Sequence, residues 1–217
     1  TVSCTNNRES GAASFTSSFS GAGMDSVNYL GDEKYVAYIN PAFEPVNESP
    51  WFSFAVSSES EISIEVTLDY GEYDHRYIPK LSSDKKSWKA INASKIKIDT
   101  VTGNAWLSLT VSPDTLYVAA QENTSSKDTY KWLDSVLTKN TFLKKEVAGK
   151  TVLGENNYVV TSNKLAKKSI VLIARQHPPE IPGGTIGFKS FYETLLSKSD
   201  IASKFRYRYN IIAFPLL

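Results

Sequence analysis

Alternation of apolar and polar residues is the feature that most constrains the fold of this chain. In EISIEVTL (61–68), apolar side chains at every second position would point to one face of a strand, and the residues between them to the other. A strand with one apolar and one polar face is half-buried and is typical of an antiparallel sheet. The stretch therefore predicts a strand that packs on a core with one side only.

Similar segments follow one another from about residue 14 to residue 111, separated by Gly, Pro, Asn, Asp or Ser. They read ASFTSSF, KYVAYI, WFSFAV, EISIEVTLDY, YIPKLSS, WKAINASKIKI and AWLSLTV. About seven short strands without a convincing helix favour an all-β sandwich, which we assign to residues 14–112.

After Pro113 the pattern changes. A strand around TLYVAAQ precedes a helix that Ser125 or Ser126 can cap and in which Tyr130, Leu133, Val136 and Leu137 recur at helical spacing. Two further strands are expected around FLKKEVAGKTV and NYVVTSN. The run IVLIA (170–174), a helix with Phe188, Phe191, Tyr192 and Leu195 on one face, and YNIIAF (209–214) then form a βαβ unit. Residues 113–217 therefore predict an α/β domain with a parallel or mixed sheet covered by helices.

Charge and hydropathy exclude several classes of protein. The formal net charge of the 217 residues is +1, and the lysines occur in scattered pairs without a basic stripe, so no nucleic-acid partner is expected. No apolar run approaches the length of about 18 residues that a transmembrane helix needs. The sequence predicts no transmembrane segment.

Cys4 is the only cysteine, so the chain cannot form an internal disulfide. TVSC is followed by polar and small residues, and residues 1–13 are predicted to be a flexible tether. This pattern is typical of a lipidated cysteine in an exported bacterial lipoprotein, which makes Cys4 a candidate lipid anchor. The alternative is an incidental thiol at a frayed terminus, so an exported or periplasmic location and a cytoplasmic one both stay open.

His177 and Glu180 are the candidate metal ligands. They lie three residues apart in RQHPPEIPGG (175–184), directly after the apolar strand, and ligands bind beyond the carboxyl ends of such strands. Imidazole and carboxylate suit zinc, and Pro178 and Pro179 would restrict the chain between them. The alternative is a surface turn with a solvated His and Glu. Arg175 is a candidate substrate-binding residue at the same edge, or else it packs within the protein or makes a local ion pair.

The stretch ARQHPPEIPGG, the following amphipathic helix and YNIIAFPLL resemble the first zinc motif and next strand of the M14 zinc metallocarboxypeptidases. SPWFSFAV (49–56) and YIPKLSSDKKSW (77–88) are similar to stretches of the β-sandwich that precedes the catalytic domain in the cytosolic carboxypeptidase-like branch. Many relatives there have Gly where this chain has Pro179. The departure keeps both presumed ligands.

The resemblance implies a hydrolase that binds one zinc ion and removes residues from the C-terminus of a peptide or protein. In this family two His and one Glu hold the zinc, another Glu is the general base and an Arg binds the terminal carboxylate. Only His177 and Glu180 carry over. The second His, the base and the Arg are expected beyond Leu217, so the chain is expected to be the front of a longer protein, with a truncated catalytic domain and negligible activity by itself.

A function of another class stays open. The sandwich could be a non-catalytic module that binds a peptide or glycan, with a degenerate peptidase region after it. Trp51, Trp88 and Trp106 would form a sugar platform in that case, whereas core packing is the simpler interpretation. His75, the other histidine, is predicted to be a solvated loop residue, and KFRYRY (204–209) a solvated helix end.

Overall fold

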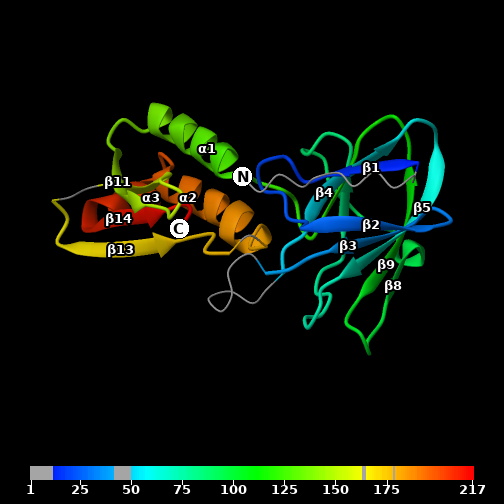
Figure 1. Cartoon of the computed structure of the whole chain (residues 1–217). Helices are drawn as coiled ribbons and strands as arrows, with labels where there is room; N and C mark the ends of the chain where they lie inside the picture. Colours follow the sequence, from blue (N-terminus) through cyan, green and yellow to red (C-terminus); the bar gives the residue numbers. More distant parts are fainter. Residues whose placement is uncertain (1–11, 42–49, 163–164, 178) are drawn as a thin grey trace. The chain divides into compact units, whose positions relative to one another are not determined.

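The computed structural model describes residues 12–41, 50–162, 165–177 and 179–217. The chain divides into two compact units, Thr1–Asn123 and Thr124–Leu217, which are described separately below (Figure 1). Cys4, the candidate lipid anchor, and residues 1–11 of the expected tether lie outside the described residues. Among the residues that are described, no helix is long and apolar enough to cross a membrane.

The first unit contains two five-stranded sheets, ordered β1-β4-β10-β6-β7 and β2-β3-β5-β9-β8. Side chains from both sheets share one core, which includes Phe54 and Val56 from the first and Val66, Leu68 and Leu107 from the second. The elements are β1 (Ala13–Thr16), β2 (Ser26–Gly31), β3 (Lys34–Tyr38), β4 (Ser53–Ser58), β5 (Ile62–Asp69), β6 (Lys80–Ser82), β7 (Lys89–Ala90), the 3₁₀ turn η1 (Ala93–Lys95), β8 (Ile96–Ile98), β9 (Ala105–Val111) and β10 (Leu116–Ala119).

Strand β5 is the alternating stretch of the sequence, and its predicted sidedness is confirmed. Ile64, Val66 and Leu68 are buried, whereas Ser63 and Glu65 are exposed. The expected antiparallel pairing holds on one side only, because β5 pairs antiparallel with β9 but parallel with β3. The sheet is therefore mixed.

Strand β2 was not expected from the sequence. It forms an antiparallel hairpin with β3 in which Gly31 is opposite Lys34, so Asp32 and Glu33 form the turn. Both turn residues have positive φ, 50° and 56°, as in a type I′ turn. Such turns favour Asn and Gly, and an Asp-Glu pair gives no clear turn signal.

The two units divide after residue 123, later than the boundary after residue 112 that the sequence suggests. The reason is strand β10, which pairs antiparallel with both β4 and β6 and so completes a sheet of the first unit.

The second unit has a four-stranded mixed sheet, ordered β11-β12-β14-β13, in which only β13 and β14 are parallel. Its elements are α1 (Ser126–Lys139), β11 (Lys144–Lys150), β12 (Asn156–Thr161), β13 (Lys168–Ile173), the π-helical segment η2 (Pro182–Gly187), α2 (Phe188–Leu196), α3 (Asp200–Arg208) and β14 (Tyr209–Phe214). With three sheets and few helices in the described residues, the chain is mostly β.

Helix α1 begins as the sequence predicts. Ser125 is the N-cap and forms a capping box with Asp128, which satisfies backbone N–H groups of the first turn. Leu133 and Val136 are buried, and Tyr130 and Leu137 pack at the edge of the same core. The predicted apolar face of this helix is confirmed.

Two expectations about the βαβ unit are wrong in detail. Phe188, Tyr192 and Leu196 form the buried face of α2, while Phe191 is exposed. Strand β13 was expected to be covered on both faces, but it is an edge strand in which Val171 and Ile173 are half exposed. The apolar run IVLIA therefore predicts the strand correctly, but it does not show how much of the strand is buried by other elements.

Candidate metal centre

The candidate ligands lie in a tight corner that follows β13, of which residues 174–177 and 179–181 are described, while Pro178 lies outside the described residues. Ala174 continues the sheet by donating its N–H to Phe214 O at the carboxyl end of β14 (3.0 Å). Arg175 then takes a left-handed conformation with a φ of 54°, which turns the chain away from the sheet. The corner thus lies at the carboxyl ends of two parallel strands, the edge where ligands bind in open α/β sheets.

His177 and Glu180 converge in this corner. His177 Nδ1 and Glu180 Oε1 are 2.8 Å apart. The other carboxylate oxygen, Oε2, accepts hydrogen bonds from the backbone N–H of Gln176 (2.8 Å) and of His177 (3.2 Å). The backbone therefore fixes one oxygen of Glu180 and directs the other toward the imidazole.

The pKa of Glu180 is lower than that of a free glutamate. Partial burial acts to raise this pKa, but the hydrogen bonds from the His177 side chain and from the backbone of His177 and Gln176 favour the charged form and prevail. Both side chains stay accessible, with 53% of His177 and 39% of Glu180 exposed. The corner thus presents an ionised carboxylate beside an imidazole that solvent can reach.

Arg175 is held inside the unit. Its Nη1 donates to Thr124 O (3.0 Å) and lies 3.4 Å from Thr185 Oγ1, whereas its buried Nε has no hydrogen-bond partner among the described residues. Burial lowers the pKa of the guanidinium. The Arg175 side chain thus connects the start of the second unit with η2.

Gly184 lets η2 pack closely against the corner. A Cβ at this position would lie 3.0 Å from Arg175 N and 3.0 Å from Glu180 Cβ, which is tighter than most real Cβ contacts. The sequence pattern does not single out Gly184, Thr185 or Thr124, although the Pro-Gly-Gly run indicates a place where backbones come close. The absence of a side chain at Gly184 therefore leaves room for Arg175 and Glu180 beside η2.

The donor set fits zinc in chemistry, but its two atoms lie closer together than two ligands of one zinc ion. Two ligand atoms about 2.1 Å from a tetrahedral zinc ion are about 3.4 Å apart, so Nδ1 and Oε1 would have to separate by roughly half an ångström to share one ion. Within the described ranges, no group of three or more His, Cys, Asp or Glu side chains could hold a metal ion. The described residues therefore bring together two candidate ligands, His177 and Glu180, at this corner.

His75 lies in a loop, as predicted, but its side chain is partly buried and not solvated as expected. Its ring is half-buried against Phe52, with centroids 6.2 Å apart, and its Nδ1 lies 2.8 Å from the hydroxyl of Tyr70. Burial lowers the pKa of the imidazole. It is a packing residue of the first unit.

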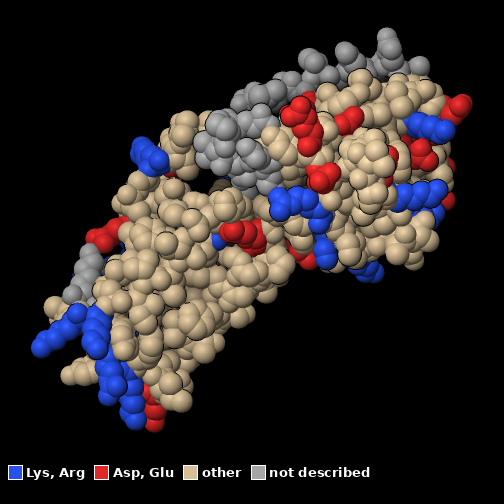
Figure 2. Space-filling view, turned by 90° about the horizontal axis from the view of Figure 1, so that it is seen from below, with Lys and Arg blue, Asp and Glu red and all other residues tan. Residues whose placement is uncertain are grey.

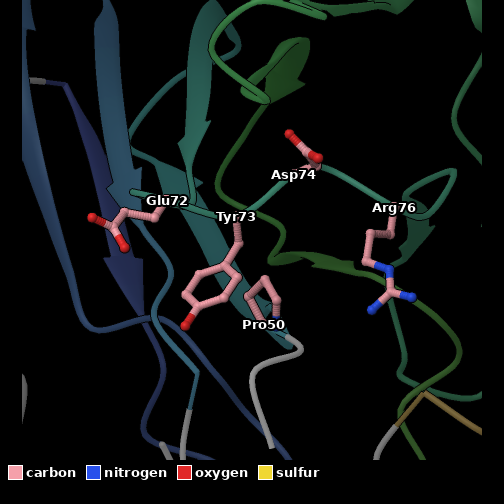
Figure 3. A pocket seen from close by; sticks show the side chains of 5 residues that line it. All are labelled: Pro50, Glu72, Tyr73, Asp74 and Arg76. Carbon is pink, nitrogen blue, oxygen red and sulfur yellow. The ribbon is translucent and has the colours of Figure 1, made fainter. Parts of the chain in front are cut away.

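A pocket of about 300 Å³ lies beside this loop and is lined by Pro50, Glu72, Tyr73, Asp74 and Arg76. Figure 3 shows the Tyr73 ring next to Pro50, whereas the charged ends of Glu72, Asp74 and Arg76 point in different directions. The charged groups do not converge on one point, so the pocket presents no catalytic set.

Two further interpretations concern aromatic residues. Residues 204–208 form the end of α3, with Lys204, Tyr207 and Arg208 exposed, so the predicted helix end is confirmed. Trp51 packs against the core of the first unit and donates its indole N–H to Gly21 O (2.9 Å).

Comparison with solved structures identifies the fold. A metallo-carboxypeptidase from Burkholderia cenocepacia superimposes with a TM-score of 0.74 at 20% sequence identity, over 94% of this chain and 55% of its own length. A metallo-carboxypeptidase from Pseudomonas aeruginosa, in complex with (2-guanidinoethylmercapto)succinic acid, gives a TM-score of 0.73 at 16% identity over 94% of this chain and 55% of its own.

The chain therefore has a metallo-carboxypeptidase-like fold and spans about half the length of these structures. No family model and no curated protein matches the sequence.

Proposed function

We propose that this chain is part of a zinc-dependent M14-like metallocarboxypeptidase that removes C-terminal residues from peptides or proteins. In this proposal a β-sandwich of the cytosolic carboxypeptidase-like branch precedes the first part of an α/β catalytic domain. The observation that carries the proposal is the convergence of His177 Nδ1 and Glu180 Oε1 at the end of β13, in a fold shared with metallo-carboxypeptidases.

His177 and Glu180 would hold the metal. Zinc, when bound, supplies Lewis acidity toward a carbonyl oxygen and acidifies water. A proton lies in the hydrogen bond between His177 Nδ1 and Glu180 Oε1. Zinc would bind the same two atoms, so zinc and this proton compete for them. The two backbone N–H groups on Oε2 keep the carboxylate in place when that proton leaves.

Arg175 acts in this proposal as a positioning residue. Its hydrogen bonds to Thr124 and Thr185 fix the backbone from which His177 and Glu180 project. By the resemblance, the third ligand, the general base and the carboxylate-binding Arg are contributed from outside this sequence. Residues 1–217 alone are therefore expected to show no enzyme-like turnover.

Zinc titration of residues 1–217, followed by two-dimensional NMR of the imidazole ¹⁵N nuclei, tests the ligand pair. His177 should lose its Nδ1 proton and shift on adding one equivalent of zinc, and Glu180→Gln should weaken the effect. The matched control is Glu65→Gln, because Glu65 is an exposed carboxylate on β5. An unchanged His177 spectrum, or binding at His75 instead, would contradict the proposed site.

Catalysis is tested with the full-length gene product and a peptide panel, read by mass spectrometry. Loss of C-terminal residues should depend on zinc, His177 and Glu180. Retained binding of a peptide or glycan without any cleavage would favour the alternative, in which the sandwich is a binding module and the peptidase region is degenerate.

A further inference from the structure

Cations from separate segments gather where β13 and β14 begin. Lys168 and Tyr209 are register partners in this parallel pair, so Lys167 and Arg208, one position earlier in each segment, are also neighbours. Lys204 lies one helical turn before Arg208 on α3. We call the exposed residues Lys167, Lys168, Lys204 and Arg208 the basic end. Figure 2 shows Lys and Arg side chains gathered at the end of the second unit, at its lower left.

The charge of the basic end is not neutralised locally. In the part of the chain that the structure describes, none of its four side chains forms an ion pair with a carboxylate, including Asp200, which lies one turn before Lys204. The second unit has 15 Lys and Arg against 7 Asp and Glu, a balance of +8, whereas residues 1–123 have 9 against 16, a balance of −7. The net charge of +1 of the whole chain therefore results from a strongly cationic second unit and an anionic first unit.

Large apolar side chains are exposed beside these cations. Leu165 is 93% exposed shortly before β13, and Tyr207 and Ile201 on α3 are each 83% exposed. Isolated exposed apolar residues are ordinary on a protein surface. Here Tyr207 and Ile201 share α3 with Lys204 and Arg208, and Leu165 lies two residues before Lys167, so apolar and cationic side chains are both available for contact.

We propose that the basic end binds the surface of an anionic lipid bilayer. Lys and Arg would meet the phosphate and carboxylate groups of the lipid heads, Tyr207 would lie at head-group level, and Leu165 and Ile201 would enter the upper acyl region. A nucleic acid would use the cations and could stack on Tyr207, but it would leave the two aliphatic side chains without a role.

The basic end lies far enough from the proposed metal site that both could function at the same time. The basic end lies at the amino ends of β13 and β14, whereas His177 and Glu180 follow the carboxyl end of β13. Six residues of strand separate the two ends by about 20 Å. A bilayer at one end would therefore leave the other end open to solvent, and the proposal does not depend on peptidase activity.

Vesicle flotation with residues 1–217 tests the proposal. The chain should float with vesicles of phosphatidylcholine and phosphatidylserine in equal parts, stay unbound with phosphatidylcholine alone, and dissociate as salt is raised. Each cation at the surface strengthens binding about fivefold, so combining Lys168→Gln with Arg208→Gln should weaken it roughly thirtyfold. Tyr207→Ser should weaken binding while leaving its salt dependence unchanged.

The matched control combines Lys89→Gln with Lys97→Gln, two exposed lysines of the first unit, and should leave binding unchanged. An equal loss in this control would overturn the assignment to the basic end, as would binding that ignores lipid charge. Fluorescence anisotropy with a single-stranded oligonucleotide completes the test. Tight binding there, sensitive to the same two substitutions and without flotation, would identify a nucleic-acid surface and refute the membrane proposal.

Discussion

Two substitutions of Arg175 separate its two roles in the corner. Arg175→Ala removes the guanidinium and keeps a Cβ, whereas Arg175→Gly removes both. The two variants lose the same hydrogen bonds to Thr124 and Thr185, so any difference between them reports the backbone at residue 175.

The magnitudes follow from the structure. Loss of a hydrogen bond from a charged donor to Thr124 O costs about 1.5–3 kcal/mol, and part of this cost is offset because a buried cation with an unpaired Nε is also removed. We therefore expect Arg175→Ala to destabilise the second unit by about 1–2 kcal/mol. At a φ of 54° an L-residue is strained by about 1–2 kcal/mol, and glycine is not. Arg175→Gly should thus be about 1 kcal/mol more stable than Arg175→Ala.

The assay is urea unfolding followed by ¹⁹F NMR of 5-fluorotryptophan. Trp132 is the only tryptophan in residues 124–217, so its resonance reports the second unit. Equal stability of the Ala and Gly variants would show that residue 175 is not left-handed. An Ala variant as stable as the wild type would show that the guanidinium does not support the corner.

Three further predictions concern other buried or strained groups. Tyr192→Phe should stabilise the second unit by about 1 kcal/mol in urea unfolding, because the buried Tyr192 hydroxyl has no hydrogen-bond partner among the described residues; destabilisation would reveal a bound water instead. Burial lowers the pKa of His75, so the unfolded chain binds more protons and stability should fall as pH drops below about 6.5. His75→Gln should reduce that fall between pH 7 and 5, and an identical pH profile would contradict it. Gly103→Ala should cost more than about 1 kcal/mol in thermal unfolding, because φ is 73° and the new Cβ would meet Asp74 Oδ1 and Tyr73 O; a variant as stable as wild type would refute this.

The predictions from the sequence are most accurate for elements in which buried residues recur at a regular spacing. The alternation in β5 and the helical spacing in α1 both depend on which side chains meet the core, and that information is local. The capping box at Ser125 and Asp128 is equally local, since all its atoms lie within one turn.

Other features depend on contacts that the sequence does not show. The hairpin at Asp32 and Glu33 adopts positive φ without Gly or Asn, so the residue types give little indication of the turn. Nothing local indicates that Arg175 reaches Thr124, 51 residues earlier, or that Lys168 lies opposite Tyr209. The sequence placed His177 and Glu180 together, whereas the groups that hold them became visible only in the structure.

Among the residues that the structure describes, one row of backbone amide and carbonyl groups of strand β13 has no neighbouring strand. Such an edge strand can pair with a strand of another molecule. Burial of the half-exposed Val171 and Ile173 would stabilise that contact. Lys167 and Lys168 at the start of the strand oppose it, because two copies brought together in parallel would place like charges side by side. Self-association of the isolated chain should therefore depend on ionic strength, with dilute low-salt buffer favouring the monomer.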